Sequence, residues 1–140
     1  MTRYLVVANQ TLGAAPLLDR LHAAAAGRDA SFYLVVPATP PRAGFTWTEG
    51  QARAIADQRL RAALGHFRNV GLDVAGEVGD PDPMLAVEDA LRHRGSDVIV
   101  LSTLPVGISR WLGVDLPQRM RSTFAQPVLH VVSGAGALVA

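Results

Sequence analysis

Short apolar runs alternate along this chain with longer segments in which apolar residues recur every three or four positions. The runs are rich in β-branched residues and end at turn-forming residues, a pattern typical of strands that are buried on both faces of a sheet. We predict strands at residues 4–8, 32–36, 72–78, 98–101 and 128–132.

The segments between these runs have the spacing of amphipathic helices. Three predicted helix starts carry capping signals. Thr46 with Glu49 fits a capping box, Asp80 precedes a proline at the first helical position, and Asp115 fits an N-cap before Leu116-Pro117. We predict helices at residues 13–26, 46–67, 81–94 and 116–124.

Strands that alternate with helices imply parallel strands joined by right-handed crossovers, with helices on both faces of the sheet. The expected fold is therefore α/β, a Rossmann-like three-layer α/β/α arrangement around a five-stranded parallel sheet. With 140 residues and 49% hydrophobic content, we expect one domain over residues 1–133 and a flexible tail over residues 134–140. Ligands of such sheets bind beyond the carboxyl ends of the strands.

Composition excludes several kinds of chemistry. Cysteine is absent, which excludes disulfides and thiolate nucleophiles, and lysine is absent, which excludes a P-loop lysine and a Schiff base. A formal net charge of +1 does not produce the positive field that captures nucleic acid. No stretch resembles a signal peptide or a membrane span, so we expect a soluble cytoplasmic protein.

Three stretches, at residues 4–9, 79–100 and 126–131, resemble the universal stress protein family, and the similarity runs from residue 3 to residue 132. The resemblance implies the strand order 3-2-1-4-5. It also implies a homodimer that pairs the last strands, through Val128, Leu129, His130, Val131 and Val132. Many members of the family bind ATP through a glycine pattern that follows strand four.

The chain departs from that family pattern. An ungapped alignment places Leu101, Leu104 and Val114 at the three glycine positions and Asp115 at the following serine position, while Asn9 replaces the aspartate of strand one. A phosphate cradle needs backbone amides that approach the phosphate closely, which glycine permits and branched residues do not. We therefore expect Leu101, Leu104 and Val114 to pack, Asp115 to cap a helix, and no cofactor to be required.

Several polar residues near the predicted strand ends remain candidates for a ligand pocket. Arg110 offers a planar fork for an anion, although a surface ion pair is the commoner role of an isolated loop arginine. Weak adenine-nucleotide binding through Arg110 is the alternative to no binding. The candidate pocket residues are Asn9, Thr11, Pro37, Ser102, Thr103, Arg110 and Asp115.

Aromatic and histidine side chains favour packing over chemistry. Trp111 is expected to anchor the loop after strand four, and Trp47 to pack at the entry of the second helix, with ligand stacking as the alternative for both. The histidines lack the spacing of a metal site. We expect His130 to be half-buried or at an interface, with a pH-sensitive dimer contact as the alternative role.

The leading hypothesis is a non-catalytic, universal-stress-type protein, a dimeric regulatory or stress-adaptive module with little or no ATP binding. Neither nucleic acid nor a membrane is an expected partner, and the sequence names no client protein. A small hydrolase that uses Asn9, Thr11, Ser102 and Asp115 is a weaker alternative, because no nucleophile has an evident base.

Overall fold

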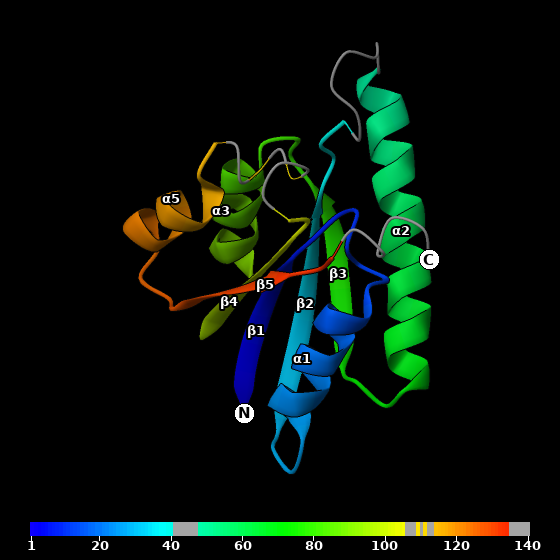
Figure 1. Cartoon of the computed structure of the whole chain (residues 1–140), viewed down its shortest axis with the longest axis vertical. Coiled ribbons are helices and arrows are strands. Elements are labelled where there is room, and N and C mark those ends of the chain that lie inside the picture. The colour runs from blue at the N-terminus through cyan, green and yellow to red at the C-terminus, as the bar shows by residue number, and fades with distance from the viewer. Residues whose placement is uncertain (41–47, 106–108, 110, 112–113, 135–140) are drawn as a thin grey trace.

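The computed structural model describes residues 1–40, 48–105, 109, 111 and 114–134. Five parallel strands form a single sheet in the order β3-β2-β1-β4-β5, which confirms the predicted topology (Figure 1). The strands are β1 (Thr2–Val7), β2 (Ala30–Pro37), β3 (Val74–Gly79), β4 (Val98–Thr103) and β5 (Val128–Val132). Pro37 thus ends β2, where the sequence predicted a loop, and β3 begins two residues later than predicted.

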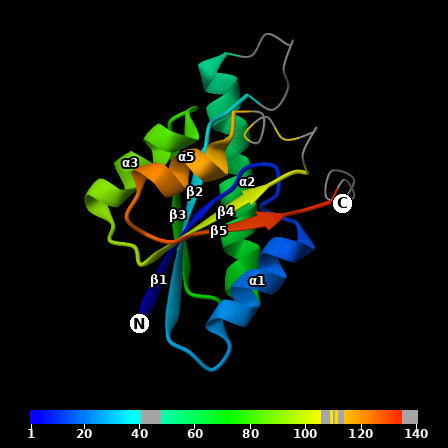
Figure 2. The same cartoon turned by 60° about the vertical axis from the view of Figure 1, so that its left-hand side comes forward.

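Helices cover both faces of this sheet, as the two views show (Figures 1 and 2). On one face lie α1 (Ala15–Ala25) and α2 (Glu49–Asn69), and on the other lie α3 (Pro83–His93) and α5 (Leu116–Thr123). The three-layer α/β/α architecture is therefore confirmed. Among the described residues, no helix is long and apolar enough to cross a membrane.

Two apolar clusters, one on each face of the sheet, form the core. Successive strand residues point to opposite faces, so Val6 and Val100 pack under α1 and α2, whereas Leu5 and Ile99 pack under α3 and α5. Both faces are buried, which is why the strands read as continuous apolar runs instead of alternating ones.

Two helices begin two residues later than their sequence signals predicted. The capping box of α2 is formed by Thr48 and Gln51: Thr48 Oγ1 accepts a hydrogen bond from the Gln51 amide (3.0 Å), and Gln51 Oε1 accepts one from the Thr48 amide (2.9 Å). Helix α3 is capped by Asp82, which accepts from the Met84 amide at 2.9 Å. Asp80 instead accepts from the Asp82 amide at 2.8 Å and shapes the preceding turn.

The predicted role of Asp115 as a side-chain cap is wrong. Asp115 occupies the N-cap position of α5 in the left-handed region, at φ 54° and ψ 45°, and its side chain makes no capping hydrogen bond. Pro117, the second residue of the helix, has no amide hydrogen to donate, which removes one of the two usual donors to an N-cap side chain. The predicted packing of Val114 is also wrong, since Val114 is 55% exposed, whereas Leu101 and Leu104 are buried as predicted.

The left-handed backbone at Asp115 leads to a prediction of stability. Asp115→Gly removes the cost of placing a Cβ in this conformation and loses no capping bond. We therefore expect the free energy of unfolding to rise by about 0.5 kcal/mol. The measurement is made in high salt, which screens the interaction of the Asp115 charge with the helix dipole. Asp82→Gly is the matched control and should lower it by a few tenths of a kcal/mol, because Asp82 does cap. Urea unfolding of both variants measures the difference, and a loss of stability in Asp115→Gly would contradict this account.

Candidate functional site

Buried polar side chains gather where β1, β2 and β4 end, at the point where the strand order reverses. Asn9 and Thr11 follow β1, and Ser102 and Thr103 end β4; all four are buried. Because the carboxyl ends of parallel strands share one edge of the sheet, residues distant in sequence meet here. Each of these side chains has a hydrogen-bond partner within the protein.

Asn9 links three elements of the fold. Its Nδ2 group donates a hydrogen bond to the carbonyl oxygen of Pro37, at the end of β2, at 2.7 Å. Its Oδ1 atom accepts a hydrogen bond from the guanidinium of Arg59, which extends from α2. An aspartate here could not donate to Pro37, so the amide is the side chain that satisfies both neighbours.

The hydroxyl groups at the end of β4 are also paired. Thr11 Oγ1 and Ser102 Oγ share a hydrogen bond of 2.5 Å on the α1 side of the sheet. Thr103 Oγ1 and His130 Nε2, from β5, lie 2.8 Å apart. Buried hydroxyls without partners are costly, and these pairs remove that cost without a ligand.

Arg59 belongs to this group of residues, and the sequence analysis missed it. Burial lowers the pKa of its guanidinium from the ordinary value. No carboxylate of the described residues forms an ion pair with it. The available signal was its spacing, because Arg59 falls among Ala52, Ala56, Leu60 and Ala63 on the buried stripe of α2, where a charge is unexpected.

The other predicted pocket residues lie outside this network. Arg110 lies outside the described residues, as does Trp47, for which packing at the second helix was predicted. Asp115 is exposed at the start of α5 and makes no side-chain capping bond. Trp111 is partly buried against the cluster under α3 and α5, which confirms its predicted packing role.

Two observations on the described residues bear on metal binding and on the hydrolase alternative. Within the described parts of the chain, no three His, Asp or Glu side chains gather as metal ligands. The hydroxyl of Ser102 bonds to Thr11, and the nearby imidazole of His130 bonds to Thr103 instead. A hydroxyl nucleophile needs a base within hydrogen-bond reach, which neither pairing supplies to Ser102.

We expect His130 to make the free energy of unfolding depend on pH. It is partly buried, as predicted, and burial together with the charge of Arg121 lowers its pKa from the ordinary value. A base with a depressed folded-state pKa contributes stability above its unfolded pKa and loses it as the pH falls. Between about pH 7 and pH 5, we expect the wild type to lose a few tenths of a kcal/mol more than His130→Gln. Equal losses in urea unfolding would show that His130 does not titrate this way.

Comparison with known proteins identifies the fold. No family model matches the chain, and no curated protein matches it in sequence. A universal stress protein from Archaeoglobus fulgidus in complex with dAMP aligns with TM-score 0.59 and 16% identity, over 94% of this chain and 98% of that one. A second structure of the universal stress protein from this organism aligns with TM-score 0.64, 16% identity and the same coverage. The chain therefore has the fold of the universal stress proteins.

Proposed function

We propose that this chain is a non-catalytic universal-stress-type protein, a dimeric regulatory or stress-adaptive module that binds ATP weakly or not at all. The observation that carries the proposal is the paired, buried network at the carboxyl ends of the strands. Asn9, Thr11 and Ser102 already bond to protein partners, so a ligand would have to displace those bonds.

The end of β4 and the two residues after it support this proposal. Leu101 and Leu104 stand where the family pattern has glycines, and both side chains are buried. Pro105 follows and has no amide hydrogen. Phosphate cradles are built from closely approaching backbone amides, and these residues limit both the approach and the number of donors.

Calorimetric titration with ATP, ADP and cyclic AMP tests this function. We expect no saturable heat with any of the three at micromolar concentrations. Saturable micromolar binding of ATP, with amide shifts at Ser102 and Thr103 in nuclear magnetic resonance spectra, would refute the proposal.

Adenine-nucleotide binding is a second candidate, favoured by two observations. The Archaeoglobus protein of the same fold is in complex with dAMP. In this chain, Arg59 brings a guanidinium without a carboxylate partner among the described residues to the same edge of the sheet. Under this candidate, nucleotide binding is measurable and is abolished by Arg110→Glu and weakened by Arg59→Ala. Nucleotide binding that neither substitution weakens would exclude this candidate function.

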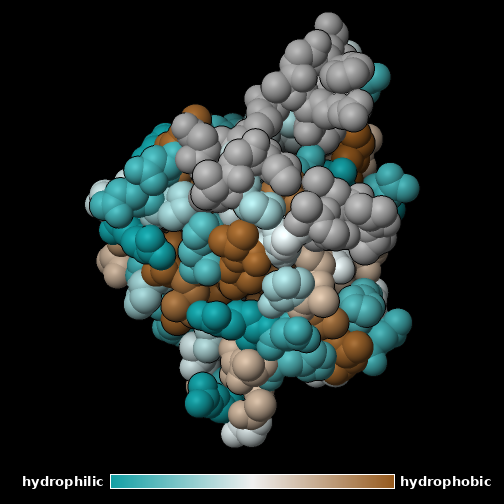
Figure 3. All heavy atoms as spheres, in the orientation of Figure 1, coloured by the Kyte–Doolittle hydropathy of each residue, from teal (hydrophilic) through white to brown (hydrophobic). Residues whose placement is uncertain are grey.

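The proposed dimer rests on β5, an edge strand of the described sheet. Val128 and Val131 are buried within the protomer, whereas Val132 is 47% exposed at the strand end. Hydrophobic side chains gather where β5 crosses the front of the molecule (Figure 3). An apolar edge with unpaired backbone groups favours pairing with a second copy.

Light scattering tests the dimer. We expect a dimer for the wild type and a shift toward monomer for Val132→Lys, because a charge on the edge opposes strand pairing. Val70→Lys is the control, since Val70 is similarly exposed (39%) at the end of α2, away from the edge. A monomeric wild type at high concentration would contradict the dimer.

A further inference from the structure

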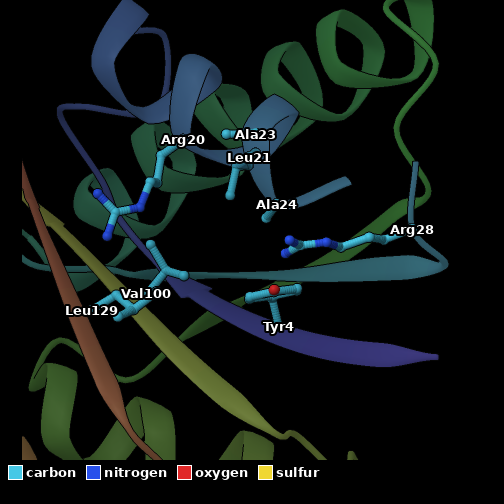
Figure 4. Close-up of a pocket in the computed structure, with 8 residues that line it drawn as sticks. All are labelled: Tyr4, Arg20, Leu21, Ala23, Ala24, Arg28, Val100 and Leu129. Carbon is cyan, nitrogen blue, oxygen red and sulfur yellow. The ribbon is translucent and has the colours of Figure 1, made fainter. Parts of the chain in front are cut away.

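A groove lies between α1 and the sheet, separate from the polar network at the strand ends. It has a volume of about 240 Å³. Its floor is formed by Tyr4, Val100 and Leu129 from β1, β4 and β5, and its roof by the carboxyl-terminal half of α1 (Figure 4). None of its lining residues belongs to the network around Asn9.

Small side chains on α1 leave this groove open. Leu21 lines the roof of the groove, and the next residues of α1 that line it, Ala23 and Ala24, have only a methyl group as side chain. The ring of Tyr4 is held on the sheet by stacking against Phe32, with ring centroids 5.2 Å apart. The groove therefore has a fixed aromatic and aliphatic floor.

Two arginines give the groove its charge. Arg20 extends from α1 and Arg28 from the turn that follows it, and the Arg28 side chain reaches over the Tyr4 ring (Figure 4). Among the described residues, neither guanidinium has a carboxylate within 4.0 Å. The lining includes no acidic residue. An apolar cleft with unpaired guanidinium groups at its margin is complementary to an anion with an apolar body.

We propose that this groove binds a small carboxylate with an apolar body, such as a medium-chain fatty acid. The guanidinium of Arg28 or Arg20 pairs with the carboxylate, and the apolar body lies on Tyr4, Val100 and Leu129. The volume is slightly below the usual range of ligand pockets, about 300–1,000 Å³, which limits the ligand to about ten heavy atoms. This site does not depend on nucleotide binding at the strand ends.

Nuclear magnetic resonance titration with octanoate tests the proposal, with 1-octanol as the neutral counterpart. We expect saturable shifts of the amides of Ala23, Ala24 and Leu129, and binding of octanoate about tenfold or more tighter than that of octanol, because a charged hydrogen bond is gained. Absent or non-saturable shifts, or shifts confined to Asn9 and Ser102, would overturn it.

Two variants separate charge from shape. Arg20→Gln/Arg28→Gln should weaken octanoate binding by about tenfold or more and leave octanol binding unchanged. Ala23→Leu should prevent the binding of both octanoate and octanol. Because Ala23 is exposed, the larger side chain does not require the core to repack. Arg53→Gln, on the exposed side of α2, is the matched control and should change neither.

Light scattering of the same samples tests whether a second copy of the chain, and not a small ligand, covers the groove. Leu129 lies on β5, so a second copy paired along that strand is the competing way to cover the groove. If octanoate binds only when Val132→Lys makes the chain monomeric, the groove is covered by the partner and the proposal is overturned. Equal affinity in monomer and dimer supports it.

Discussion

Gly76→Ala is expected to lower the free energy of unfolding by about 3 kcal/mol, at the upper end of the usual cost of overpacking. A Cβ at this position of β3 would lie 2.6 Å from the backbone oxygen of Leu34 and 2.7 Å from Leu60 Cδ1. The leucine side chain can rotate, but the backbone oxygen belongs to the neighbouring strand and cannot move alone. Urea unfolding measures the loss.

Gly65→Ala is the control, because the same substitution should have the opposite sign there. Gly65 lies in α2, and an added Cβ would meet no atom within 4 Å. Alanine favours a helix interior over glycine, so we expect a gain of about 0.5–1 kcal/mol. If Gly76→Ala proved neutral while Gly65→Ala stabilised the protein, the close approach of Gly76 to the Leu34 backbone on β2 would be wrong.

Asn9→Ala is expected to lower the free energy of unfolding by about 2–3 kcal/mol. The change leaves the carbonyl oxygen of Pro37 and the guanidinium of Arg59 without the partner that each now has. A partly buried charge that loses its partner is more costly than a neutral group. This substitution therefore measures how far the edge of the sheet depends on its internal network.

A double-mutant cycle tests whether Arg59 is the charged partner that Asn9 stabilises. In an Arg59→Ala background, Asn9→Ala should cost about 1 kcal/mol less, because no charge is left unpaired. Arg53→Ala is the control background, since Arg53 lies exposed on the same helix. An unchanged cost in the Arg59→Ala background would show that Arg59 contributes nothing to the network.

Helix starts show where local patterns mislead. Thr46 with Glu49 and Thr48 with Gln51 both satisfy the capping-box spacing, and the structure uses the second pair. Likewise, both Asp80 and Asp82 precede a proline, and the helix begins after Asp82. Each local signal is present twice, so the choice depends on where the helix packs on the sheet.

The candidate site was predicted in part. The strand ends indicate that Asn9, Thr11, Ser102 and Thr103 share one edge, and their burial supports this grouping. Their bonding partners were not predictable, because the Thr11–Ser102 and Thr103–His130 pairs join segments 91 and 27 residues apart. Arg59 reaches Asn9 across 50 residues, which no local motif encodes.

The apolar runs and helical spacing alone were enough to predict the parallel three-layer fold, because burial on both faces leaves a periodic signature along each element. Only the tertiary structure decides which hydrogen bonds the buried polar side chains at the strand ends make. A buried polar group can bond only to the neighbours that packing places beside it, and here those neighbours come from distant segments. Leu101 and Leu104 are buried as their apolar side chains predict, whereas Val114 is exposed. Asp115 makes no capping bond, in a left-handed backbone followed by Pro117, which has no amide hydrogen to donate.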